Sequence, residues 1–178
     1  RQDFLVLIDQ EGGRVQRLRP PIARSLPPAA VYAGLYARDP EGAKRAAFSV
    51  ARLTGEELRA FGITMNCAPV ADLPVDGSHE IISDRAYGSS VADVVALARS
   101  VAAGYLASGV VPVVKHIPGH GRATADSHLS LPVVPASRQT LSETDFAPFK
   151  ALADLPAAMT AHVVYSAIDA ANPASTSA

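Results

Sequence analysis

Histidine, lysine and aspartate side chains with the potential for proton transfer are concentrated in the segment 115–128. It begins KHIPGHG at residues 115–121 and ends DSH at residues 126–128. A carboxylate close to an imidazole, as at Asp126 and His128, holds one tautomer and stabilises the imidazolium, which makes the histidine a better proton shuttle. A single histidine is most often structural, but this concentration within 14 positions after an apolar run predicts a catalytic loop.

Two other polar clusters carry groups that can bind a substrate. The segment 9–17 reads DQEGGRVQR, and Asp9 can accept hydrogen bonds from substrate hydroxyls while Arg17 donates from across the loop or braces Asp9 as an ion pair. The segment 83–88 reads SDRAYG, in which Arg85 is a candidate donor to substrate, although taken alone it would be a surface arginine. Asn66 and Asp72 are expected to organise the rim of the site rather than to contact ligand.

A zinc site is the alternative reading of the same loop. Enough nitrogen and oxygen ligands are present: His116, His120, His128, His162 and Asp126. Their gaps match no compact zinc signature, Pro118 and the glycines around it preclude a helical histidine pair, and Lys115 would repel a cation. We therefore expect no bound metal.

The apolar runs and breakers predict alternating strands and helices. The expected strands are 4–8, which reads as buried on both faces, 63–68, 110–114 and 157–164, and the expected helices are 40–61, 91–108 and 142–152. Lys115 is expected to begin the loop after the third strand, and residues 20–40 are expected to be irregular because of two Pro-Pro pairs.

This order implies parallel strands joined by right-handed crossovers, as in a doubly wound sheet or a (β/α)₈ barrel. No Gly-x-Gly-x-x-Gly follows a strand, and polar residues follow strand after strand, which favours the barrel. A whole barrel needs about 250 residues. Residues 1–178 are therefore predicted to be a single partial TIM barrel of the α/β class, about half of the whole.

Composition limits the partners. The chain has 16 basic and 17 acidic residues, so no basic surface predicts nucleic-acid binding. Apolar runs such as 4–8 are too short to span a bilayer, so no membrane partner is expected. The single Cys67 excludes an internal disulfide and fits a reducing compartment.

The motifs DQEGGRV, KHIPGHG and DSH together resemble those of bacterial β-N-acetylhexosaminidases of glycoside hydrolase family 3, over essentially the whole chain and in the same order. The resemblance implies a (β/α)₈ barrel that removes terminal, non-reducing β-linked N-acetylglucosamine with retention, through a covalent glycosyl-enzyme and without a cofactor. It implies His128 as general acid/base with Asp126 as its partner. The implied sugar contacts are Asp9, Arg17, Arg85, Lys115 and His116.

The resemblance further implies a cytoplasmic enzyme that acts on muropeptides in cell-wall recycling. The family's nucleophilic aspartate belongs to a later segment that residues 1–178 do not contain, and the first and last barrel strands are also expected to be missing. We therefore expect the isolated chain to be inactive and poorly stable, because open strand edges would be exposed.

Other activities stay open on the same residues. A β-glucosidase or an N-acetylglucosaminide phosphorylase would use the same scaffold, and a non-catalytic sugar-binding protein would need no nucleophile. A metal-dependent hydrolase is the remaining alternative, which sensitivity to a chelator would reveal.

Overall fold

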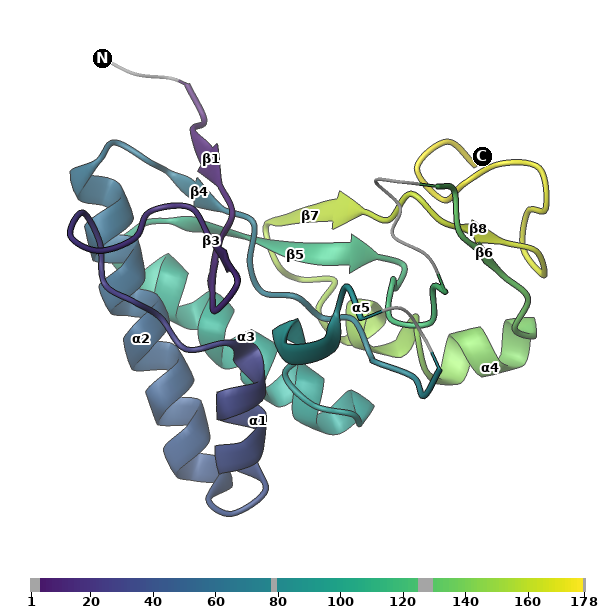
Figure 1. Cartoon of the computed structure of the whole chain (residues 1–178), viewed down its shortest axis with the longest axis horizontal. Helices are drawn as coiled ribbons and strands as arrows, with labels where there is room; N and C mark the ends of the chain where they lie inside the picture. The colour runs from purple at the N-terminus through teal and green to yellow at the C-terminus, as the bar shows by residue number, and fades with distance from the viewer. Residues whose placement is uncertain (1–3, 78–79, 125–129, 178) are drawn as a thin grey trace.

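The computed structural model describes residues 4–77, 80–124 and 130–177, and a four-stranded parallel sheet lies at its centre (Figure 1). The strand order is β1-β4-β5-β7, so the four strands follow one another in space in the same order as along the chain. These strands are β1 (Leu7–Ile8), β4 (Met65–Asn66), β5 (Val111–Ile117) and β7 (Ala157–Thr160). Two small sheets flank it: β2 (Gln10–Gly12) with β3 (Val15–Gln16), and β6 (Val133–Val134) with β8 (Val164–Tyr165).

The helices gather on one side of the central sheet, where α2, α3 and α5 lie next to one another (Figure 1). The helices are α1 (Ala29–Tyr36), α2 (Pro40–Ala60), α3 (Val91–Ser108), α4 (Arg138–Glu143) and α5 (Ala147–Ala151), with a short 3₁₀ turn η1 (Ser83–Arg85). A doubly wound sheet reverses its strand order and carries helices on both faces, whereas a barrel does neither. The unreversed order and the single helical layer are therefore an arc of a (β/α)₈ barrel, and the predicted fold class is confirmed.

The two long helices agree with the predicted boundaries because both carry local start and stop signals. Asp39 caps α2, its carboxylate accepting from the backbone N–H of Gly42 at 2.9 Å. Ser90 caps α3 in the same way through the N–H of Asp93 at 3.2 Å, and Gly109 ends it with φ +77°. The helices pack closely at Gly104, where a Cβ atom would collide with the carbonyl oxygen of Phe48.

Helix α3 is a core helix, although its 18 residues with a mean hydropathy of 1.3 are long and apolar enough to cross a membrane. Its apolar stripe is buried against α2 and the sheet, as the sequence predicts: Val94, Leu97, Ala98, Val101 and Tyr105. In this fold the apolar composition of α3 is accounted for by its packing.

The first predicted strand is wrong in extent and burial. Only Leu7 and Ile8 form β1, and the side chains before them are exposed, Phe4 at 78% and Leu5 at 67%. The reason is position, because β1 is an edge strand that pairs with β4 alone among the described residues.

Other predicted elements also differ from the structure. The predicted strand 157–164 is two strands, β7 and β8, that belong to different sheets, and the predicted strand 63–68 is limited to the two residues of β4. Residues 29–36 form α1 within the region expected to be irregular. Pro28 lies just before the first helical residue, where a missing backbone N–H removes no hydrogen bond from the helix. The predicted helix 142–152 is two helices, separated where buried Asp145 pairs with Arg122. Strand β5 also continues through Ile117, so Lys115 lies inside it rather than in the loop. It does so because the backbone of Lys115 pairs with the segment after β4: its N–H donates to the carbonyl oxygen of Pro69 at 3.1 Å, and its carbonyl oxygen accepts from the N–H of Ala71 at 2.7 Å.

Candidate active site

A pocket of about 760 Å³ opens at the carboxyl ends of the parallel strands. Asp9 follows β1, Lys115 and His116 lie near the end of β5, and His162 follows β7. The polar side chains that line it are Asp9, Glu11, Arg14, Arg17, Arg85, Lys115, His116, His120, Thr160 and His162. This is the end of a barrel at which active sites are found.

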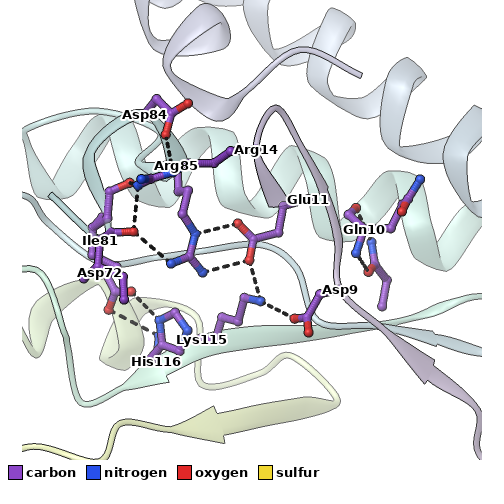
Figure 2. Close-up of polar contacts among 12 residues, drawn as sticks. Asp9, Gln10, Glu11, Arg14, Asp72, Ile81, Asp84, Arg85, Lys115 and His116 are labelled. Atoms are coloured by element: carbon purple, nitrogen blue, oxygen red, sulfur yellow. Dashed lines mark hydrogen bonds and ion pairs between the residues drawn. The ribbon is translucent and has the colours of Figure 1, made fainter. Parts of the chain in front are cut away.

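Two carboxylates and two cations form one connected group, called here the charge cluster: Asp9, Glu11, Arg85 and Lys115. Figure 2 shows Glu11 between the two cations, with Arg85 donating to both of its oxygens at 2.8 Å. The Nζ of Lys115 lies 2.5 Å from Glu11 Oε1 and 2.8 Å from Asp9 Oδ1. The cluster therefore links segments that are far apart in sequence into a single wall of the pocket.

The cluster is charged despite its burial. Side-chain exposure is 2% for Lys115, 8% for Glu11 and 11% for Arg85. Burial alone would raise the pKa of Glu11, but the hydrogen bonds from Arg85 and the charge of Lys115 outweigh it and hold the pKa below 4.5. Burial likewise opposes ionisation of Asp9, and Lys115 more than offsets it, so that this pKa lies below 3.8. Both carboxyl groups are therefore ionised at neutral pH.

The β2–β3 hairpin directs Glu11 into the pocket. Buried Gln10 is fixed by Asn66, which accepts from its backbone N–H and donates to its carbonyl oxygen, both at 2.9 Å. Gly12 has φ +105°, and a Cβ atom there would collide with the carbonyl oxygen of Pro27. A side chain at position 12 would therefore displace the hairpin, and with it the neighbouring Glu11.

Asp72 fixes the orientation of His116. It is fully buried, and its carboxylate lies 2.6 Å from His116 Nδ1 and accepts from the backbone N–H of His120 at 2.7 Å and of His116 at 3.2 Å. Burial opposes its ionisation, but the charge and hydrogen bond of His116 prevail, and the pKa of Asp72 is lowered. An ionised Asp72 accepts a hydrogen bond from the Nδ1–H group, which leaves His116 Nε2 for a partner in the pocket.

Three further groups lie at the pocket wall. The guanidinium of Arg17 lies 3.7 Å from Asp9 Oδ2 and is 64% exposed. His162 has Nδ1 2.6 Å from the hydroxyl of Ser175. Burial, with the Asp72 charge opposing it, lowers the pKa of His120, so this buried imidazole is neutral at pH 7. Among residues 4–77, 80–124 and 130–177, no three His, Cys, Asp or Glu side chains are placed to hold a metal ion.

The structure brings the five predicted binding residues to one pocket: Asp9, Arg17, Arg85, Lys115 and His116. It also places Asn66 and Asp72 behind the rim, as expected. The predicted pair Asp126 and His128 lies outside the described residues. Arg85 is not a surface arginine, and its partner Glu11 was missed by the sequence reasoning. A signal existed, since Glu11 follows Asp9 by two positions and thus shares its side of an extended segment.

A partial (β/α)₈ barrel with a charged pocket at the strand ends has the arrangement in which barrel enzymes hold their active sites. The sequence matches the glycosyl hydrolase family 3 N-terminal domain over residues 3–178. The chain belongs to this family, and the resemblance drawn from its motifs is confirmed.

Named relatives agree with this assignment. The chain is 46% identical over 171 residues to a β-hexosaminidase from Alkalilimnicola ehrlichii, covering 95% of this chain and 49% of the relative. It is 42% identical to a β-hexosaminidase from Methylococcus capsulatus, covering 97% and 51%. The chain thus spans about half the length of the curated relatives that it matches.

Solved structures are also similar. NagZ from Neisseria gonorrhoeae in complex with N-trifluoroacetyl-D-glucosamine superposes with a TM-score of 0.88 at 35% identity, covering 95% of this chain and 50% of that one. LpqI from M. tuberculosis superposes with a TM-score of 0.83 at 35% identity, covering 96% and 48%.

Proposed function

We propose that the protein containing this chain is a retaining β-N-acetylhexosaminidase that removes terminal β-linked N-acetylglucosamine. The observation that carries the proposal is the pocket at the strand ends, walled by the charge cluster and His116, in a family 3 barrel. A fixed carboxylate acceptor, Asp9, and N–H donors on one wall suit a ligand covered with hydroxyl and amide groups. A relative crystallised with an N-acylglucosamine supports the same class of ligand.

The roles proposed for the residues follow from their chemistry. Asp9, at 36% exposure, accepts from sugar hydroxyls, and Arg17, Arg85, Lys115 and His116 donate to or accept from the remaining oxygens. Asp126 and His128 form the proton-transfer dyad. The second carboxyl group expected of a retaining enzyme is a nucleophilic aspartate from outside residues 1–178.

The reaction then has two steps. The carboxylate nucleophile attacks C1 while His128 gives its proton to the departing oxygen. His128 next takes a proton from water, which attacks C1 and releases the sugar with its original configuration. An imidazole with an unperturbed pKa of about 6.5 suits both directions at neutral pH.

We further propose that the natural substrates are cell-wall muropeptides, processed in the cytoplasm during peptidoglycan recycling. The support is the family assignment and the absence of any internal disulfide in a chain with one cysteine.

The deciding experiment measures phenol release from aryl β-N-acetylglucosaminide and from aryl β-glucoside. It uses the product of the complete open reading frame that encodes this chain and, separately, residues 1–178 alone. We expect hydrolysis of the first substrate by the complete product, with loss of about 10²–10⁴-fold in His128→Ala, and none by residues 1–178. Turnover by residues 1–178 would contradict the proposed outside nucleophile, and preference for the glucoside would contradict the hexosaminidase.

The phosphorylase alternative is tested in the same assay. Added phosphate would yield a sugar 1-phosphate if the protein were a phosphorylase, whereas a hydrolase yields free N-acetylglucosamine at all phosphate concentrations.

A further inference from the structure

Glu11 contacts both buried cations of the pocket. Its Oε1 lies 2.8 Å from Arg85 Nη2 and 2.5 Å from Lys115 Nζ, and its Oε2 lies 2.8 Å from Arg85 Nε. With both oxygens engaged and only 8% of the side chain exposed, Glu11 has little capacity left for a ligand.

These contacts hold three separate parts of the barrel rim at fixed positions. Glu11 lies on the β2–β3 hairpin, Arg85 ends η1, and Lys115 lies in β5 (Figure 2). Arg85 is restrained a second time by the carbonyl oxygen of Ile81, which accepts from its Nη1 at 3.0 Å. Without Glu11, Lys115 would keep its contact with Asp9 and Arg85 its contact with Ile81, but no contact within residues 4–77, 80–124 and 130–177 would join the two cations to each other.

The contacts decide which N–H groups face a ligand. Arg85 carries five N–H groups and Lys115 three. Three of the former and two of the latter are used by partners among the described residues. Three donors have no such partner within the part of the chain that the structure describes, and they lie on side chains that line the pocket and are held by Glu11. Such donors match acceptor oxygens, namely hydroxyl groups and the carbonyl of an N-acetyl group.

Stability alone is a weak reason for this arrangement. Buried ion pairs often stabilise a fold no better than apolar residues of similar volume, because desolvation opposes the attraction. The outer surface also shows that a bidentate arginine–carboxylate pair forms in this fold without burial, since Arg99 Nη1 and Nη2 pair with Asp154 at 2.8 Å and 3.0 Å with side-chain exposures of 46% and 63%.

We propose that Glu11 is a positioning residue of the pocket, acting through Arg85 and Lys115 without touching the sugar. The expected loss of activity rests on the proposed function, whereas the positions of Arg85 and Lys115 follow from the contacts of Glu11 alone. A glutamine at position 11 keeps the shape and one acceptor, while its amide N–H₂ opposes a cationic donor, so the guanidinium of Arg85 must turn away.

The test compares Glu11→Gln with Glu57→Gln in the complete gene product. Glu57 is a matched control because it pairs with Arg24 Nε at 3.2 Å on α2, and it does not line the pocket. With activity corrected for the folded fraction by circular dichroism, we expect kcat/KM on aryl β-N-acetylglucosaminide to fall about 100-fold in Glu11→Gln. Glu57→Gln should retain wild-type activity. An equally active, folded Glu11→Gln would overturn the inference.

A double variant separates positioning from a general structural role. If Glu11 acts through Arg85, adding Glu11→Gln to Arg85→Met should lower kcat/KM by less than about tenfold, because the group it positions is already lost. Losses that multiply would show that Glu11 acts independently of Arg85, against the proposal.

A third measurement does not depend on activity. In ¹H–¹⁵N spectra, the Nε–H signal of Arg85 should exchange slowly with water in the wild type and in Glu57→Gln, and rapidly in Glu11→Gln. If the wild type cleaves no aryl glycoside, the proposed function fails while this signal still judges the positioning of Arg85. An unchanged signal in Glu11→Gln would refute the positioning.

Discussion

Asp72 offers the sharpest test of how the pocket is built, because one buried carboxylate serves three donors. It accepts from His116 Nδ1 at 2.6 Å, and from the backbone N–H groups of His120 at 2.7 Å and His116 at 3.2 Å. The substitution Asp72→Asn keeps an oxygen for the two backbone donors and turns an amide N–H₂ toward the imidazole. It therefore removes the contact that orients His116 while preserving side-chain shape.

The size of the effect follows from the bonds lost. A hydrogen bond to a charged group contributes about 1.5–3 kcal/mol, and the lowered pKa of Asp72 shows that its contacts outweigh its burial. We expect Asp72→Asn to lower the free energy of unfolding by about 1.5–3 kcal/mol. Asp72→Ala, which leaves all three donors without this acceptor, should lower it by about 3–5 kcal/mol. If His116 contacts the sugar, Asp72→Asn should also lower kcat/KM by about 10- to 150-fold.

Urea unfolding followed by circular dichroism measures the stability effect in residues 1–178 where that chain unfolds cooperatively, and in the complete gene product otherwise. Asp154→Asn is the matched control, because Asp154 is 63% exposed and solvent screens its pair with Arg99, so the urea midpoint should stay close to that of the wild type. An Asp72→Asn variant within about 0.5 kcal/mol of the wild type, the range of ordinary surface substitutions, would refute the reasoning.

Three further predictions concern stability. Gly121→Ala should lower the unfolding free energy by about 1–3 kcal/mol, because its Cβ would collide with the carbonyl oxygen of Leu73. Gly34→Ala should raise it by about 0.5–1 kcal/mol, because glycine within a helix is less stable than alanine and nothing lies within 4 Å of a Cβ at that site in α1. Equal urea midpoints for the two variants would contradict this. The carboxyl groups of the charge cluster and of Asp72 have pKa values lowered from 3.8 and 4.5. Their contribution to the free energy of unfolding is therefore complete above these unfolded values and is lost as the pH falls through the still lower folded values. A urea midpoint that does not change between pH 6 and pH 3, a range of about three units around these values, would contradict this. Ser90→Ala should lower the unfolding free energy by about 1 kcal/mol by removing the cap of α3, and an unchanged thermal midpoint would count against it.

Local signals in the sequence were sufficient where an element depends on its own residues. The bounds of α2 and α3 follow from Asp39, Pro40, Ser90 and Gly109, all of which act within one helical turn. They were insufficient where a neighbour decides. Strand β5 continues past Lys115 because the segment after β4 forms hydrogen bonds with the backbone of Lys115. The residues next to Lys115 in the sequence carry no signal that predicts this contact.

The class of fold, the family and the five predicted binding residues that line the pocket all follow from the sequence alone, because strand ends in a parallel barrel share one rim and the motifs lie at those ends. The partners of these residues, in contrast, depend on how the chain folds. Glu11 lies 74 positions from Arg85, and Asp72 lies 44 from His116. Burial makes such pairs necessary, since an unpaired charge in the rim would be strongly destabilising, but the choice of partner depends on which segments the barrel brings together.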